Sequence, residues 1–198
     1  MKGSSGLPAA FFDLAMGALF VLLAIVLIST VEDPKKSSAE TIQPKAEFLV
    51  TMDWDDNSPD DIDLYVRSPD GKIVFFSNRQ TPVMFLDADN LGHGNTLTMP
   101  DGSVVTVPTR REVVTIRAIV PGIWTINSHF YRKASPAGTV DHCLVTLTKL
   151  NPYAELAQVP YEMDTQTQER TIESFVVEPD GRVSSQYADN VKLVGVPQ

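Results

Sequence analysis

The sequence predicts one N-terminal transmembrane α-helix followed by an all-β antiparallel sandwich domain. The first observation is a single uninterrupted apolar run, Leu7–Val31, which contains one acid. The second is an alternation of apolar and polar residues with period two, which begins at Glu47 and is typical of half-buried strands. The third is a series of short β-rich runs separated by Pro, Gly, Asn and Asp, which favours a sandwich.

The apolar run is long enough for a helix that crosses a membrane. Such a helix would reach roughly 35 Å, against about 30 Å for the hydrocarbon layer. Its single acid, Asp13, would cost at least about 2.5 to 3.5 kcal/mol inside hydrocarbon, so a residue of this kind normally faces protein or water and marks an ion path. The alternative is that Asp13 lies at the headgroup level, or caps a helix that begins at Leu14.

Composition divides the chain into four segments. Residues 1–6 are small and polar and form a short tail, and residues 7–31 are the expected transmembrane helix. Residues 32–46 are charged and contain two prolines, which indicates an exposed linker. Residues 47–198 are sufficient for one β-sandwich domain with a sizeable core.

The β domain begins with an amphipathic strand in which Phe48, Val50, Met52 and Trp54 share one face. Further strands are expected at 62–66, 72–76, 113–120, 123–131, 144–150, 170–177 and 191–196, with a loop at 87–95 and a small surface hairpin at 96–106. No helical periodicity occurs after residue 31. The pattern therefore predicts antiparallel β structure throughout this domain.

Net charge and cysteine content exclude several classes of protein. The net charge of −9 argues against a nucleic-acid partner, because phosphate binding needs clustered Lys and Arg. Cys143 is the only cysteine, so neither an intrachain disulfide nor a cysteine-rich zinc site can form. We expect Cys143 to be a small core residue. The alternative is an interchain disulfide in a dimer, which would need two such residues face to face.

Acidic residues are concentrated around the first predicted turn. Calcium takes about six to eight oxygen ligands, which converging carboxylates could supply. The candidate ligands are Asp53, Asp55, Asp61 and Asp63. Asp87, Asp89 and Asn90 would complete such a site if their loop folded beside the first hairpin. The alternative is a solvated acidic rim, because turns favour Asp and the spacing is not that of an EF-hand.

No arrangement of residues predicts an enzyme. His93, His129 and His142 are too scattered in the sequence to suggest a zinc triad. No serine, cysteine or histidine arrangement suggests a nucleophile with its base. We therefore expect no catalytic residues, and no cofactor apart from calcium.

Aromatic residues offer a candidate carbohydrate platform only if they are exposed. The candidates are Phe75, Phe76, Tyr131 and Tyr153. Trp54, Trp124 and Phe130 fall on inward positions by alternation, and such residues more often form a core. No site is assigned to the aromatic residues.

The start of the chain resembles a family of ion-driven motor subunits. A short tail, then Phe12-Asp13-Leu14 and an apolar stretch to Ile28, is similar to the transmembrane helix of ExbD, TolR and MotB. The resemblance implies a chain that begins in the cytoplasm, crosses the bacterial inner membrane once and places its β domain in the periplasm. It also implies a homodimer inside a pentameric multi-helix partner of the ExbB, TolQ or MotA kind, in which Asp13 carries the ion.

A second resemblance covers the β domain from residue 47 to residue 150. The order of a tryptophan, a D-x-D-L strand, a P-x-G turn and a later P-G-I-W run is similar to the YfaP-like domain, a β-sandwich family of unknown function in bacterial envelope proteins. The matching residues are Trp54, Asp61, Asp63, Leu64, Val66, Pro69, Gly71, Asn78, Asp87, Pro121-Gly122-Ile123-Trp124, Phe130 and Tyr131. This resemblance implies a fold rather than an activity.

Together these features predict a B-type subunit of a five-to-two rotary membrane motor driven by protons or sodium ions. Asp13 would bind an ion from the outer side and release it to the cytosol, since a buried carboxyl with a raised pKa can hold a proton near neutral pH. The β domain would pass motion to an envelope partner or anchor on it. The alternative is a membrane-tethered envelope binding module for glycan, peptidoglycan or protein, without ion transport.

Overall fold

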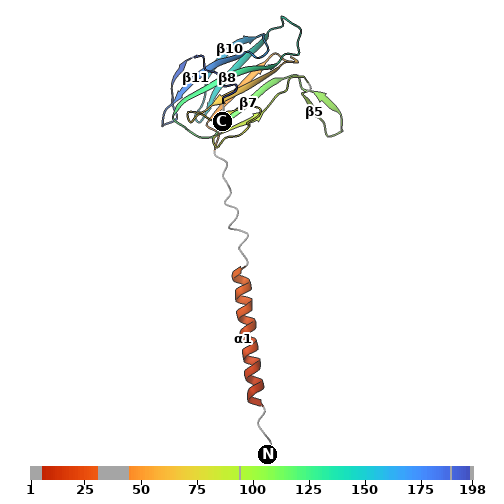
Figure 1. Cartoon of the computed structure of the whole chain (residues 1–198), viewed down its shortest axis with the longest axis vertical. Coiled ribbons are helices and arrows are strands. Elements are labelled where there is room, and N and C mark those ends of the chain that lie inside the picture. The colour runs from red at the N-terminus through yellow and green to blue at the C-terminus, as the bar shows by residue number, and fades with distance from the viewer. Residues whose placement is uncertain (1–5, 31–44, 94, 188, 197–198) are drawn as a thin grey trace, which may run out of the picture. The chain divides into compact units, whose positions relative to one another are not determined.

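The computed structural model describes residues 6–30, 45–93, 95–187 and 189–196. The chain divides into two units, residues 1–43 and residues 44–198. The first contains helix α1, Gly6–Thr30, and the second contains the strands (Figure 1). Most of the predicted tail at 1–6 and linker at 32–46 lies outside the described residues.

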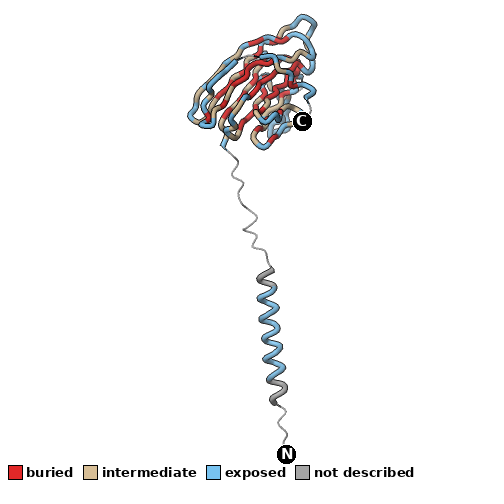
Figure 2. Tube along the Cα trace, turned by 60° about the vertical axis from the view of Figure 1, so that its left-hand side comes forward, coloured by how far each residue is buried: buried red, intermediate tan, exposed pale blue. Residues whose placement is uncertain are grey.

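Helix α1 is the part of the fold-class prediction that the structure corrects. Its described side chains run from residue 11 to residue 26, and all of them, Asp13 included, are exposed (Figure 2). Over the residues that the structure describes, no helix combines the length and the apolar character that a membrane crossing requires. The predicted transmembrane helix at 7–31 is therefore wrong on this finding. The prediction rested on apolar length alone, and the described residues contain no span that meets the requirements of a crossing.

The β domain is an antiparallel sandwich of two sheets with a separate small hairpin. Sheet A contains β1 (Phe48–Trp54), β4 (Met84–Ala88), β7 (Arg110–Ile116), β9 (Asp141–Leu150) and β10 (Tyr153–Met163). Sheet B contains β2 (Asp61–Arg67), β3 (Ile73–Val74), β8 (Gly122–Arg132), β11 (Glu169–Val177) and β12 (Val183–Tyr187). The hairpin consists of β5 (Thr96–Thr98) and β6 (Val104–Thr106). The strand orders are β10-β9-β1-β7-β4 and β12-β11-β8-β2-β3.

Strand β1 shows how the alternating sequence produces a sheet with one buried face. Its first, third, fifth and seventh residues are buried, and the residues between them are half-buried. The strand pairs with β7 on one side and with β9 on the other, so neighbouring strands satisfy its backbone groups. Its apolar face packs into the core between the two sheets, as the period of two predicts.

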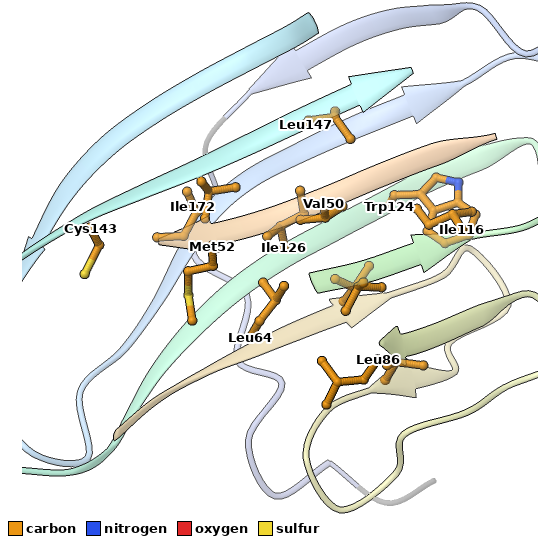
Figure 3. Packing of buried hydrophobic residues seen from close by; sticks show 14 of the residues in the cluster. Val50, Met52, Leu64, Leu86, Ile116, Trp124, Ile126, Cys143, Leu147 and Ile172 are labelled. Atoms are coloured by element: carbon orange, nitrogen blue, oxygen red, sulfur yellow. The ribbon is translucent and has the colours of Figure 1, made fainter. Parts of the chain in front are cut away.

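The core lies between sheet A and sheet B (Figure 3). Trp124 is fully buried and stacks on Phe175, with the ring centroids 6.2 Å apart. Cys143 is a buried free thiol in the same core, which confirms its prediction as a core residue. The cluster and the side chains packed on it extend from Phe48 to Val183, all within the second unit. The β domain therefore contains a complete core of its own and can fold independently.

The pattern-based strand assignment missed β4, β10 and β12, and it placed a strand at 191–196 that the structure does not contain. The C-terminal segment instead lies against sheet B through side chains. The backbone N–H of Leu193 donates to Glu169 Oε1 at 2.5 Å, and the carbonyl of Val191 accepts a hydrogen bond from Asn127 at 2.6 Å. Polar side chains of β8 and β11 take the place of a neighbouring strand, so an apolar run remains irregular.

Candidate metal centre

Three carboxylates converge where the edges of the two sheets approach each other. Asp63 lies on β2, Glu112 lies on β7, and Asp89 directly follows β4. One oxygen from each side chain lies within 4.8 Å of the others. The cluster joins the two sheets, because β2 belongs to sheet B whereas β4 and β7 belong to sheet A.

The edge of β2 explains how Glu112 reaches the opposite sheet. Among the described strands, β3 pairs with β2 only at Val66 and Arg67, which leaves the first part of β2 free on that side. There the backbone N–H of Leu64 donates to Glu112 Oε2 at 2.7 Å. Glu112 is fully buried and lies opposite Met52 in the β1–β7 register. An acid thus occupies a position where the alternation would place an apolar side chain.

Asn90 holds the loop that carries Asp89 beside this edge. A bulge between Leu86 and Ala88 interrupts the pairing of β4 with β7 just before Asp89. The N–H of Asn90 faces Glu112 Oε1 at 3.4 Å, and its side-chain Nδ2 donates to the Thr109 carbonyl at 3.1 Å. Both ends of the segment 90–109 are therefore tied next to the carboxylates.

Several oxygens in this region are buried without a hydrogen-bond partner among the described residues. Asp63 is only 2% exposed, and its Oδ2 has no partner. Asp89 Oδ1 and Asp61 Oδ1 are also buried atoms without a partner. His129 Nδ1 lies 3.8 Å from Asp63 Oδ2, which is too far for a hydrogen bond. Native proteins rarely bury polar atoms unpaired, so these oxygens indicate a site for a bound group.

Burial raises the pKa of two acids of this cluster, Glu112 and Asp63, and of the neighbouring Asp61. It raises the pKa of Glu112 well above its ordinary value, although the N–H of Leu64 works in the opposite direction. Burial also raises the pKa of Asp63, opposed by His129. Burial, assisted by the charge of Asp63, raises the pKa of Asp61 to about 6. A bound cation would stabilise the charged forms of these carboxyl groups and release any protons that they hold.

Arginines at the rim balance the acids only in part. Arg79 Nη1 lies 3.4 Å from Asp89 Oδ2, and Arg132 Nη2 lies 3.7 Å from Asp61 Oδ2. About half of each arginine side chain is exposed, so solvent screens both ion pairs. Where the buried acids of the cluster are ionised, a cation can therefore neutralise charge that the two arginines do not.

The donor set and its spacing suit calcium. Hard divalent cations bind carboxylate oxygens, whereas zinc sites normally use histidine and cysteine. Oxygens that all lie within 4.8 Å of one another are close enough to share one such cation. Water would supply the remaining ligands.

Two of the predicted calcium ligands lie elsewhere. Asp53 forms two hydrogen bonds with Arg111, at 2.6 and 3.1 Å, on the outer surface of sheet A. Asp55 accepts a hydrogen bond at 2.9 Å from the backbone N–H of His142. Both carboxylates already have partners in sheet A, whereas Asp63 belongs to sheet B. Of the predicted set, only Asp63 is in the cluster, and Asp61 borders it.

The sequence reasoning did not select Glu112, although a signal was present. Arg110, Glu112, Val114 and Ile116 occupy alternate, buried positions of β7, so an acid breaks an inward-facing series. Asp89 and Asn90 of the predicted loop do lie next to Asp63 and Glu112. Asp13, the predicted ion carrier, lies on α1 in the other unit.

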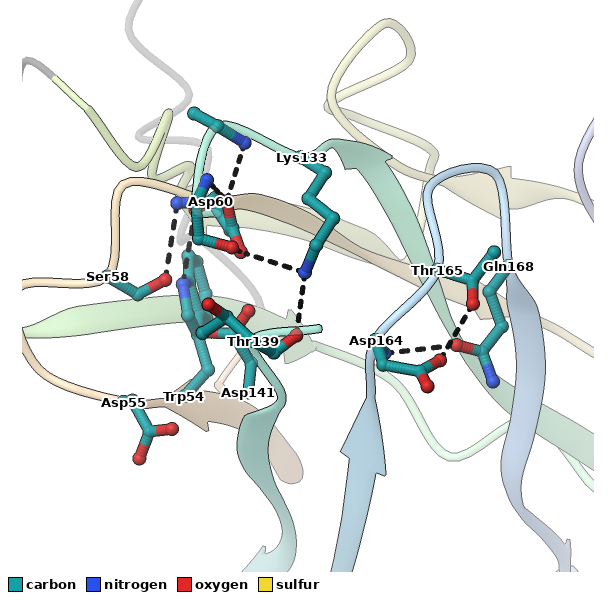
Figure 4. A network of polar contacts seen from close by, with 12 residues as sticks. Trp54, Asp55, Ser58, Asp60, Lys133, Thr139, Asp141, Asp164, Thr165 and Gln168 are labelled. Atoms are coloured by element: carbon teal, nitrogen blue, oxygen red, sulfur yellow. Dashed lines mark hydrogen bonds and ion pairs between the residues drawn. The ribbon is translucent and has the colours of Figure 1, made fainter. Parts of the chain in front are cut away.

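A second buried acid, Asp60, has a full set of partners. Its Oδ1 accepts hydrogen bonds from the N–H groups of Ala134 and Ser135, both at 2.6 Å, and its Oδ2 accepts one from the Ser135 hydroxyl (Figure 4). Burial works to raise the pKa of Asp60, but these hydrogen bonds outweigh it and the pKa is lowered. Asp60 therefore ties two loops together and leaves no oxygen for a metal ion.

The remaining candidates do not form a site among the described residues. His129 lies beside Asp63, His142 lies beside Asp55, and His93 lies on a different loop, so no histidine triad is formed. The residues that the alternation places inward are buried, as predicted. They are Trp54, Trp124, Ile126 and Phe130. The candidate platform residues do not all lie together. The ring centroids of Phe76 and Tyr131 are 5.3 Å apart, whereas Tyr153 lies on β10, an edge strand of sheet A.

Comparison with known proteins identifies no family for this chain. No known family matches the sequence, and no curated protein matches it either. One solved structure, described as the crystal structure of the unknown function protein SAV2460, is similar with a TM-score of 0.47 and 14% sequence identity. The match covers 77% of this chain and 94% of that one.

Proposed function

We propose that the β domain is a calcium-dependent binding module in which Asp63, Asp89 and Glu112 hold the ion. The observation that carries this proposal is the convergence of three carboxylates from both sheets, two of which have buried oxygens without partners. A cation there would neutralise charge that burial makes unfavourable. We infer that binding of the ion, rather than catalysis, is the activity of this site.

The bound ion would add a further link between the two sheets and the loop that follows β4. Asp63 lies in sheet B, and Glu112 lies in sheet A, so one ion would bind to both sheets. Asp89 begins the loop whose two ends Asn90 holds together. Calcium would therefore order the segment 90–109 relative to the sandwich, and a surface on that segment would be presented in a calcium-dependent way.

The test is a calorimetric titration of the isolated β domain, residues 44–198, with calcium and then with magnesium. Calcium should bind at one site, magnesium should bind more weakly, and Asp63→Asn and Glu112→Gln should each weaken calcium binding at least tenfold. Asp101→Asn, a change of the same kind in the exposed hairpin turn, is the matched control and should bind normally. Equal calcium affinity in Asp63→Asn and the unchanged domain would refute the proposal.

The role as an ion-driven motor subunit stays a prediction that rests on the resemblance of the first thirty residues. It concerns α1 and Asp13, whereas the calcium proposal concerns residues 44–198 alone. The measurement that addresses it is purification of the full chain with its membrane partners, followed by counting of copies. Two copies with five of a multi-helix protein, and loss of activity in Asp13→Asn with normal assembly, would support it. A chain purified without such a partner would count against the homodimer, the pentameric partner and the inner-membrane location alike.

A further inference from the structure

The β5–β6 hairpin exposes an unusual concentration of apolar side chains. All six residues of its two strands are exposed, and the hairpin extends away from the two sheets (Figure 1). The large apolar residues exposed on it are Leu97, Met99, Val104 and Val105. Leu91, which is 58% exposed, adds a further apolar side chain near its base. Exposed apolar groups gathered in one element mark an interaction surface rather than ordinary surface residues.

The apolar residues occupy both faces of the hairpin. Leu97 lies opposite Val105, whereas Val104 lies opposite Thr98 one position along, so their side chains point to opposite faces. A groove on a protein partner would cover one face and leave the other in water. A hydrocarbon environment surrounds an inserted element and accommodates both faces.

The base of the hairpin is fixed to the cation site. Asn90 ties the beginning of the segment to Thr109 at its end, next to Glu112. Gly92 has a φ of +64° and packs so closely that a Cβ there would lie 2.2 Å from the Asp60 carbonyl oxygen. The N–H of His93 donates to the Pro59 carbonyl at 3.1 Å. The orientation of the hairpin is therefore coupled to the loop that carries Asp89.

The charges around the hairpin suit an anionic surface once calcium is bound. The segment 95–107 has one acid, Asp101, and no basic residue. At its base, the half-exposed Arg79 and Arg132 face Asp89 and Asp61. A cation that neutralises these acids would leave the arginines to meet headgroup phosphates, while the apolar tip enters the outer acyl region.

We propose that the β5–β6 hairpin inserts into the surface of an anionic phospholipid layer when calcium occupies the carboxylate cluster. This proposal rests on the calcium site proposed above and assigns that site its partner. The hairpin would penetrate only the headgroup and upper acyl region, since its edge N–H and C=O groups need water or headgroup partners.

The test is cosedimentation of residues 44–198 with vesicles of about three parts phosphatidylcholine to one part phosphatidylserine. The unchanged domain should sediment with these vesicles in calcium, and EGTA should release it. Leu97→Asp and Val105→Asp, made separately, should each reduce the bound fraction at least tenfold. Tyr153→Asp removes an exposed apolar side chain and adds the same charge on the edge strand β10, so this control should bind like the unchanged domain.

Calorimetry on the same variants separates this proposal from the calcium site. Leu97→Asp and Val105→Asp should keep normal calcium affinity, which also shows that they fold. Normal calcium binding without vesicle binding would overturn the lipid proposal alone, and so would equal sedimentation of the hairpin variants or binding that persists in EGTA. Calcium-induced self-association that Leu97→Asp abolishes would assign the hairpin to a second copy and reject lipid. Absence of calcium binding would remove both proposals.

Discussion

The backbone N–H of Leu64 donates a 2.7 Å hydrogen bond to Glu112 Oε2, across a separation of 48 residues and between two different sheets. This bond replaces a strand neighbour at the edge of β2 with a carboxylate from β7. It places a buried acid within reach of Asp63 and Asp89. The stability of the sandwich at this edge and the candidate calcium site therefore depend on the same side chain.

Replacing Glu112 with alanine should destabilise the β domain even without calcium. The change leaves the buried N–H of Leu64 without its acceptor and opens a small cavity, which together should lower the free energy of unfolding by about 2–3 kcal/mol. Urea denaturation measures this difference. Glu155→Ala, an exposed acid on β10, is the control and should change the free energy by less than about 0.5 kcal/mol. Equal midpoints for the two variants would contradict the role of this bond.

Calcium should raise the melting temperature of the β domain. A ligand at about one hundred times its dissociation constant stabilises the native state by about 2.7 kcal/mol, which corresponds to about 5–10 °C for a domain of this size. Asp63→Asn should lose most of this increase, because its carboxylate is one of the three that converge. Differential scanning calorimetry with calcium and with EGTA gives the comparison. An increase of the same size in Asp63→Asn would show that calcium acts elsewhere.

The stability of the calcium-free domain should fall as the pH rises through about 6. The pKa of Asp61 is raised from 3.8 to about 6, mainly by burial, and that of Asp141 is raised to about 6 in the same way. A raised carboxyl pKa contributes stability that is complete below the unfolded-state value and is lost above the folded-state value. Melting temperatures from about pH 5 to about pH 7.5 should therefore decrease in EGTA.

Two comparisons check the source of this pH dependence. Asp61→Asn should make the slope shallower, because asparagine carries no proton to lose. Saturating calcium should also oppose the loss for the cluster acids, because the ion stabilises their charged forms. A calcium-free domain that becomes more stable between these pH values would contradict the assignment of raised pKa values to buried acids.

Gly92→Ala should destabilise the loop beside the cation site much more than Gly102→Ala destabilises the hairpin turn. Both glycines have positive φ, +64° and +83°, so both changes introduce backbone strain. Only Gly92 packs against backbone, with the added Cβ 2.2 Å from Asp60, whereas nothing lies within 4 Å of that position at Gly102. We expect about 1 kcal/mol for Gly102→Ala and at least about twice that for Gly92→Ala. Similar losses would show that the close contact is readily relieved.

Trp124→Ala should cost about 3–5 kcal/mol, because the indole is fully buried and stacks on Phe175. Its Nε1 also donates to the Val120 carbonyl at 3.0 Å, and the variant leaves that acceptor unpaired. Ile123→Ala, at the adjacent and half-exposed position of β8, should have a much smaller effect. Chemical denaturation gives the free energy of unfolding of both variants. A much larger loss in Trp124→Ala would show that burial in the core, rather than a place on β8, determines the effect.

Some of the candidate site was accessible from the sequence. The period of two identified β1 and β2 and placed Asp63 on a strand next to an acidic turn. The loop with Asp89 and Asn90 was recognised as a potential second contributor. Glu112 was missed because a lone acid in a strand is common on exposed faces, and its inward orientation depends on the register of β7 against β1.

The limits on the strand prediction have the same origin. Strand β10 contains Pro160 and alternates poorly, yet it forms because β9 offers an edge with which it can pair. The apolar run at 191–196 stays irregular because side chains of sheet B already satisfy its backbone. The transmembrane prediction for 7–31 rested on apolar length alone, and no helix within the described residues qualifies as a membrane span.

The sequence by itself determined that the chain from residue 47 onward is mainly antiparallel β structure, because alternation and turn residues act over a few neighbouring positions. It also determined that Cys143 belongs to the core and that acids gather near the first turn. Only the tertiary structure decided which acids meet. Asp63, Asp89 and Glu112 come from segments up to 49 positions apart, and their convergence depends on two sheets packing in one register. Local sequence carries no record of that packing, because it results from burial of the whole core at once.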